Sequence, residues 1–180
     1  MNLPFGLDEK ILSGIGITNF GVVETASIRF SPEVRSYCAG NMCRNYGATW
    51  ACPPAVGTLE ECASKIRRFS RALVFSSVYT LEDSFDFDGM RAGHREFKAV
   101  CDRLHALLDG EFLLLSNEGC IRCAHCTYPD APCRFPEKLF PSLEGFGIFV
   151  NELAALASVP YKAGENTVSY FGLLCYNDSI

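Results

Sequence analysis

The feature that most constrains this chain is a group of four closely spaced cysteines in the stretch GCIRCAHCTYPDAPCRFP (119–136). The spacing C-x2-C-x2-C-x6-C lets three thiolates wrap around one face of a cubane, while the fourth returns to close it. Structural zinc sites draw instead on two separated pairs of ligands, so zinc is the weaker alternative. The stretch therefore predicts a 4Fe–4S cluster held by Cys120, Cys123, Cys126 and Cys133.

A second cysteine-rich stretch, YCAGNMCRNYGATWACPP (37–54), supplies three more thiolates, and we expect a second 4Fe–4S cluster there. Cys62, shortly downstream, is the candidate for its fourth ligand, although free cysteine is also among the most buried residue types. The other alternative leaves one iron open to water, a small ligand or a partner's side chain, as catalytic metal sites do. We favour the open iron, because a residue just after the first turn of a helix can equally face the core. The cysteines of this stretch are Cys38, Cys43 and Cys52, and Tyr46 and Trp50 are expected to shield them from solvent.

Length and composition indicate a single domain over residues 1–180, with enough apolar residues (48%) for a sizeable core. The net charge of −5 argues against a protein that binds nucleic acid by neutralising phosphates. The chain begins without the features of a signal peptide and contains no apolar run of membrane-spanning length. We therefore expect a cytoplasmic protein, in which clustered cysteines bind metal or do redox chemistry and disulfides are rare.

The residue pattern predicts an α/β fold: a central sheet of about four strands with flanking helices and two cysteine-rich metal loops. The helix at 58–69 carries a capping box, with Thr58 as N-cap and Glu61 three residues later. The segment 90–110 has apolar residues at helical spacing. Strands are expected at 21–30, 71–80, 112–116 and 167–176, and a further helix at 142–159 despite Gly145 and Gly147.

The pieces YCAGNMCRNYGATWACPP, CIRCAHCTYPDAPCRFP and PSLEGFGIFV, in this order and spacing, resemble the predicted metal-binding proteins grouped as family 2284 of the domains of unknown function. The resemblance covers the chain from Tyr37 to Val150. It implies metal or cluster binding with no established reaction, and it implies the seven cysteines of the two stretches as ligands. Cys62, Cys101 and Cys175 receive no such assignment, and the latter two are expected in the core.

Basic residues lie inside or beside both cysteine stretches. Positive charge near a thiolate-ligated cluster offsets its negative charge, and the same side chains can hold an anionic substrate or an acidic partner. The acidic stretch EDSFDFD (82–88) is more typical of a solvated loop than of a cation site. His94 and His105 are expected at surface or core positions and not as metal ligands. The basic candidates for cofactor binding are Arg44, Arg122 and Arg134, with His125 and Lys138 expected to join the latter two in a positive rim.

Two hypotheses of different class follow from these patterns. In one, the protein is an oxygen-sensitive enzyme of redox or sulfur chemistry, whose first cluster binds substrate at an open iron while the second relays electrons. In the other, it is a non-catalytic electron-transfer or accessory module for a partner enzyme. We expect a redox partner protein or a small-molecule substrate and no contact with nucleic acid or membrane. The oligomeric state stays open, with a homodimer as one alternative.

Overall fold

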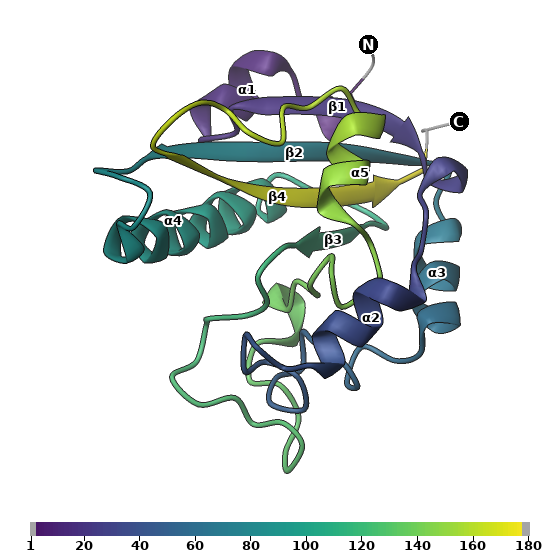
Figure 1. The fold of residues 1–180 in the computed structure, drawn as a ribbon. Helices are drawn as coiled ribbons and strands as arrows, with labels where there is room; N and C mark the ends of the chain where they lie inside the picture. Colours follow the sequence, from purple (N-terminus) through teal and green to yellow (C-terminus); the bar gives the residue numbers. More distant parts are fainter. Residues whose placement is uncertain (1–2, 178–180) are drawn as a thin grey trace.

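The computed structural model of the protein describes residues 3–177. It has the predicted α/β architecture, a small domain built on a four-stranded antiparallel sheet (Figure 1). None of its helices is long and apolar enough to cross a membrane, within the described part of the chain. The elements follow the order α1 (Glu9–Gly14), β1 (Asn19–Glu24), α2 (Pro32–Ala39), α3 (Leu59–Arg67), β2 (Arg71–Thr80), α4 (Phe87–His105), β3 (Leu113–Ser116), α5 (Val150–Leu156) and β4 (Thr167–Tyr176).

The sheet has the strand order β1-β2-β4-β3, so the last strand of the chain inserts between β2 and β3. Strand β2 pairs with β4 along its whole length, from Arg71 opposite Tyr176 to Thr80 opposite Thr167. Side chains alternate between the two faces, as strand geometry requires. Both faces are buried, which explains why β2 and β4 read as nearly continuous apolar runs.

Two apolar clusters cover the two faces of the sheet. On one face, Leu73 and Phe75 of β2 pack with Phe97 and Leu104 of α4. On the other, Val74 packs with residues of α3 and α5 and with the segment between β3 and α5. The capping box of α3 is present as predicted, because Thr58 and Glu61 each bond to the other's backbone N–H. The sheet is therefore the middle layer of a helix–sheet–helix arrangement.

The prediction of a helix at 142–159 is wrong for the first half of that range. Helical structure begins only at Val150, and the preceding residues form a tight turn in which the N–H groups of Phe146 and Ile148 donate to Ser142 and Leu143. Gly147 has φ +80°, and a Cβ there would lie 2.2 Å from Leu59 Cδ1. A helix cannot continue through that backbone conformation, so the glycine separates the turn from α5.

The strand expected at 21–30 is also shorter than predicted. It ends at Glu24, and the unpredicted helix α2 (Pro32–Ala39) lies between it and the first cysteine loop. Ser31 caps α2 by accepting a hydrogen bond from Glu33 N (3.2 Å), and Pro32 occupies the first turn. As a result Cys38 lies in the last turn of a helix. The helix over 90–110 instead spans Phe87–His105, and α1 was not predicted.

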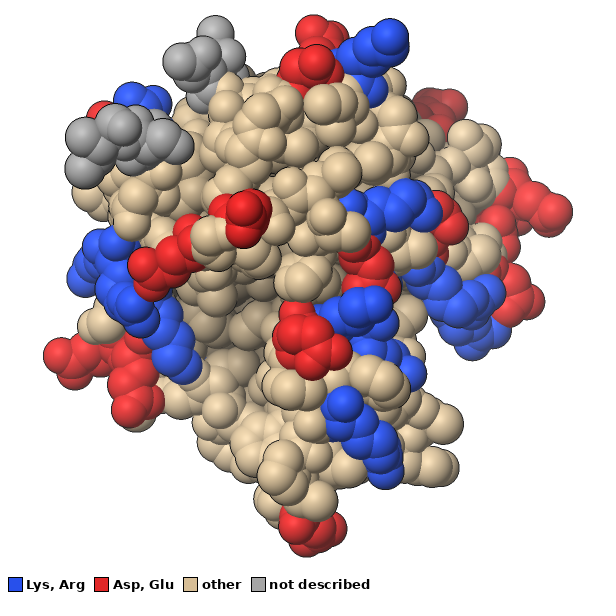
Figure 2. All heavy atoms as spheres, turned by 180° about the vertical axis from the view of Figure 1, so that it is seen from behind, with Lys and Arg blue, Asp and Glu red and all other residues tan. Residues whose placement is uncertain are grey.

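The two cysteine-rich loops lie together at one end of the molecule, beyond the β3 edge of the sheet (Figure 1). One loop (40–57) follows α2 and the other (117–141) follows β3. Acidic and basic side chains are interspersed on the face shown in Figure 2, in keeping with the small net charge of −5. The sheet thus serves as a platform that brings two segments far apart in the sequence to one place.

Candidate metal centre

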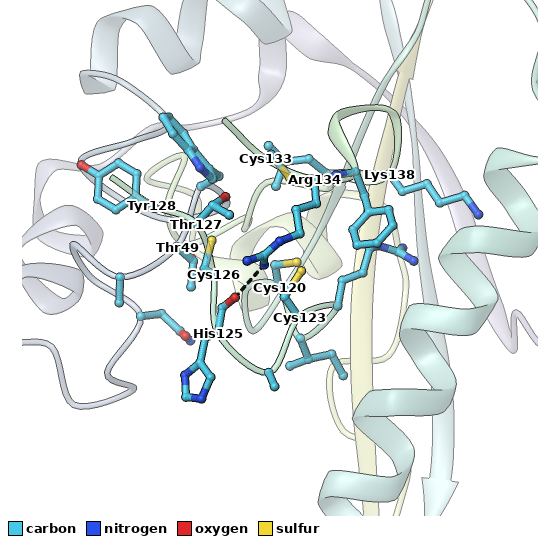
Figure 3. A pocket seen from close by; sticks show the side chains of 18 residues that line it. Thr49, Cys120, Cys123, His125, Cys126, Thr127, Tyr128, Cys133, Arg134 and Lys138 are labelled. Atoms are coloured by element: carbon cyan, nitrogen blue, oxygen red, sulfur yellow. Dashed lines mark hydrogen bonds between the residues drawn. The ribbon is translucent and has the colours of Figure 1, made fainter. Parts of the chain in front are cut away.

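The loop after β3 encloses a cavity of about 500 Å³, the second-loop cavity. All four cysteines predicted as ligands line it, and each is partly exposed to solvent (Figure 3). All ten cysteines of the chain are free thiols. The second-loop cavity therefore has a wall of soft sulfur donors, namely Cys120, Cys123, Cys126 and Cys133.

The six residues between Cys126 and Cys133 form a compact turn that returns the chain to the cavity. Thr127 Oγ1 donates to the carbonyl of Pro132 (2.8 Å), and Ala131 N donates to the carbonyl of Thr127 (2.9 Å). Trp50 Nε1 donates to the carbonyl of Ala131 (3.1 Å), and the Trp50 ring packs edge-on against Tyr128. The first loop thus braces the second, and Trp50 shields the second-loop cavity, whereas we had expected it to shield the first set of cysteines.

Three basic side chains besides His125 line the second-loop cavity. Arg134 extends over it and donates to the carbonyl of His125 (2.9 Å; Figure 3). Arg122 is half-buried and pairs with Asp102 (2.5 Å) on α4. Lys138, like Arg134 and His125, is exposed. The fourth predicted basic residue, Arg44, is exposed and lines neither cysteine cavity.

The other predicted cysteines line a separate cavity of about 410 Å³, the first-loop cavity. Cys38 comes from the end of α2, and Cys43 and Cys52 come from the loop that follows. Tyr46 lies at this cavity, as predicted. Two carboxylates also line it, Glu118 from the segment after β3 and Glu144 from the turn before α5. The first-loop cavity therefore combines three thiols with oxygen donors.

Arg35 of α2 holds the frame of the first-loop cavity together. Its Nη1 donates to the carbonyl of Gly145 (2.6 Å) and its Nη2 to the carbonyl of Gly57 (2.8 Å). Ser142 N donates to the carbonyl of Ala51 (2.9 Å), and the Cys52 thiol lies 3.7 Å from Ser142 Oγ. These bonds join α2, the first loop and the turn at 142–148 into one unit.

Cys62 does not line the first-loop cavity. It is fully buried in the apolar cluster beneath α3, beside Ile66 and Leu143. Its sulfur donates to the carbonyl of Val56 (3.6 Å) and lies 3.9 Å from Arg35 Nη1. The helix turns this residue to its apolar face, so the structure separates Cys62 from the other three cysteines. Cys101 and Cys175 are fully buried, as predicted.

The Cys38 and Cys52 thiols of the first-loop cavity are protonated at neutral pH in the absence of a metal. Burial raises the pKa of Cys38 to about 11, and the nearby Glu144 carboxylate raises it further. Burial also raises the pKa of Cys52, and this effect is larger than that of the hydrogen bonds with Thr49 and Ser142, which lower it. A metal must displace these protons to bind thiolate, so its affinity rises with pH.

Glu144 and Lys98 are partly buried charged groups that sequence reasoning missed. Burial raises the pKa of Glu144 to about 7, and the backbone N–H of Glu118 lowers it by hydrogen bonding. Burial lowers the pKa of Lys98, whose Nζ donates to Ser116 Oγ and to the carbonyl of Asn117 (both 2.7 Å). One signal pointed to Glu144: it is the single charged residue in the apolar stretch 139–150.

The two cysteine cavities adjoin each other at Gly119. This glycine has φ +77°, and a Cβ there would lie 3.1 Å from Cys52 Sγ and 3.2 Å from Asn45 Nδ2. Asn45 lines both cavities, and Cys120 follows Gly119 directly. Because Gly119 has no side chain, the sulfur of Cys52 can pack against the backbone directly before Cys120.

The remaining candidates lie away from the thiols. Asp86, within the acidic stretch 82–88, caps α4 by accepting from Gly89 N (2.8 Å). His105 packs against Phe112 and Phe140. His94 stacks on Tyr170 and lines a further cavity of about 460 Å³, which shares Glu118 and Glu144 with the first-loop cavity. Burial lowers the pKa of His94 to about 4, so its imidazole is neutral.

Within residues 3–177, no three or more His, Cys, Asp or Glu side chains converge on a point that could hold a single metal ion. A 4Fe–4S cubane does not require such convergence, because each thiolate binds a different iron and the ligands surround a volume. The cysteines line two cavities of this kind, four in one and three in the other. Arg134 is exposed at the second-loop cavity, so its side chain can move aside for a bound group.

Comparison with protein families gives a match that covers most of the chain. The family model described as "Predicted metal-binding protein (DUF2284)" matches residues 21–176, which include both cysteine loops and all of the sheet except the first two residues of β1. No curated protein and no solved structure matches the chain significantly.

Proposed function

Because the chain belongs to the DUF2284 family of predicted metal-binding proteins, we propose that its metal is iron, held as two 4Fe–4S clusters, and that the protein acts in redox chemistry. The observation that carries this proposal is the pair of adjoining cavities with cysteine walls. A single structural zinc ion would use four convergent ligands and would leave three further cysteines without a role.

The four thiols of the second-loop cavity would hold one cluster completely. Phe135 N lies 3.5 Å from the Cys133 sulfur, and such N–H donors, like the basic residues at this cavity, stabilise the reduced cluster. With every iron bound to cysteine, this cluster has no coordination position for a substrate. Its role is electron relay.

The three thiols of the first-loop cavity would hold the other cluster and leave one iron without cysteine, since Cys62 faces the core. Such an iron can bind a substrate directly or polarise it. The cavity continues past Glu144 to His94 and Tyr170, which gives a small molecule space beside the thiols. This supports the enzyme over the purely electron-transferring module.

The exposed basic residues at the second-loop cavity support a partner that delivers or accepts electrons there. Arg134, His125 and Lys138 surround a cavity open to solvent. Redox partners meet through small, charged and transient contacts, so an acidic electron carrier fits this surface. The Cys52–Gly119 contact then offers a short path from the second cluster to the first.

Paired ligand variants test the proposal. Cys126→Ser and Cys43→Ser are each purified anaerobically and examined, after stepwise reduction, by electron paramagnetic resonance. We expect two distinct reduced-cluster signals in the unaltered protein, with one lost in each variant. Loss of no signal in either variant, or of both signals in each with the fold intact, would overturn the assignment of two separate clusters.

A further inference from the structure

The first-loop cavity is lined by a carboxylate as well as by its three thiols. Glu144 lines this cavity together with Cys38, Cys43 and Cys52. Glu144 follows Ser142 by two residues, and Ser142 Oγ lies 3.7 Å from the Cys52 sulfur, so the turn that carries Glu144 packs directly against one of the three thiols. Glu144 therefore stands where a fourth ligand is missing.

The local backbone fixes the direction of the Glu144 side chain. Glu144 lies in the turn that replaces the expected helix, where Ser142 Oγ accepts from Gly145 N (2.8 Å). The flanking Leu143 and Phe146 are buried in the core, and Glu144 faces the opposite way, into the cavity. Arg35 binds the carbonyl of Gly145 and so ties this turn to the helix that carries Cys38.

Glu118 is the other carboxylate at this cavity, but its position differs. Its side chain is exposed, whereas that of Glu144 is only partly exposed. The Glu118 charge raises the pKa of Glu144, and the Glu118 backbone N–H lowers it. Glu118 is therefore the more solvated of the two carboxylates at this cavity. Lys98, on α4, adds a positive charge that favours the ionised form of Glu144. Glu144 is thus a partly buried carboxylate at the wall of the first-loop cavity.

We propose that Glu144 is the fourth ligand of the first-loop cluster and binds, through its carboxylate, the iron that no cysteine reaches. This inference rests on the proposed function and deepens it. The donor set is then Cys38, Cys43, Cys52 and one carboxylate oxygen. A carboxylate holds the iron of a cluster less firmly than a thiolate does, so this iron is the one that exchanges its ligand for a molecule entering the cavity.

The direct test uses protein labelled with ¹³C-glutamate and reconstituted anaerobically with iron and sulfide. Electron–nuclear double resonance on the reduced first-loop cluster is expected to show a ¹³C coupling, lost in Glu144→Gln and kept in the matched control Glu118→Gln. A coupling that is absent in the unaltered protein, or that survives in Glu144→Gln, overturns the assignment.

Mild oxidation gives a second, independent readout. The iron without a thiolate is expected to leave first, so the unaltered protein loses about one iron per chain and shows a 3Fe–4S signal. Glu144→Cys, which completes the set of thiolates, should suppress that signal, while Glu118→Gln should not. An equal signal in Glu144→Cys and the unaltered protein contradicts the inference. A protein that binds iron only at the second loop overturns the proposed function as well, and the iron count distinguishes the two failures.

Discussion

At the scale of single residues, the environment of each cysteine separates the candidate ligands from the core. Each of the seven cysteines that line the two cavities has some exposed surface, down to 6% at Cys52, whereas Cys62, Cys101 and Cys175 have none. Residue type alone could not make this distinction. It depends on which face of a helix or strand each thiol occupies.

We predict that Cys62→Ala retains the full iron content of the protein but lowers its free energy of unfolding by about 1 kcal/mol, because the variant removes a buried sulfur without removing a ligand. Iron analysis and denaturant unfolding under anaerobic conditions check both parts. Loss of the first-loop cluster in this variant would make Cys62 the fourth ligand in place of Glu144.

His94 gives a prediction for pH. Its pKa is lowered from 6.5 to about 4 in the folded protein, so between these values the unfolded chain binds a proton that the folded protein does not. This contribution to stability is present above pH 6.5 and is lost as the pH falls toward 4. The stability advantage of the unaltered protein over His94→Gln should therefore shrink over that range in parallel denaturation curves. A constant difference would mean that His94 is not buried in its neutral form.

At the scale of elements, local signals predicted those parts of the fold that local sequence determines. The capping box at Thr58 located α3, and the long apolar runs located β2 and β4. The turn before α5 escaped prediction because its sequence also fits an amphipathic helix. Its conformation depends on Gly147, whose positive φ is fixed by the close approach of Leu59, a residue far away in the sequence.

For the candidate site too, the sequence predicted only the parts that lie close together along the chain. Cysteine spacing identified the two loops, because ligands close in sequence reveal a site locally. Glu144 reaches the first-loop cavity from the turn before α5, and Glu118 reaches it from the start of the other cysteine loop, so only the folded chain brings them to these thiols. A lone charge in an apolar stretch marked Glu144 as unusual without saying what it faces.

Arg35 carries the prediction for the elements around the first-loop cavity. The guanidinium of Arg35 donates one hydrogen bond to the carbonyl of Gly57 and one to the carbonyl of Gly145. Arg35→Met removes both bonds and leaves the two carbonyls without this donor. We expect a loss of about 2 kcal/mol in the free energy of unfolding, and less iron at the first loop than at the second.

The matched control for Arg35→Met is Arg29→Met. Arg29 forms an exposed ion pair with Glu152 (3.0 Å), and such pairs contribute little to stability. Its removal should change neither stability nor iron content appreciably. Equal effects of the two variants would show that Arg35 does not hold the frame of the cavity together.

At the scale of the whole molecule, the sheet places the two cysteine loops together at one end and leaves the second-loop cavity open to solvent. Electron transfer from a partner should then depend on the basic residues around that cavity. We predict that Lys138→Glu slows reduction by an acidic electron carrier at low salt, and that Lys10→Glu, in α1, does not. The difference should disappear as salt screens the charges. A difference that persists at high salt would count against this docking surface.

The content of metal and sulfide in the anaerobically purified protein tests the central claim most directly. Two cubanes predict about eight irons and eight sulfides per chain, with no zinc. Cys123→Ser should lower both numbers by about half, because it disrupts the second-loop cluster alone. Zinc in place of iron, without sulfide, would contradict the account.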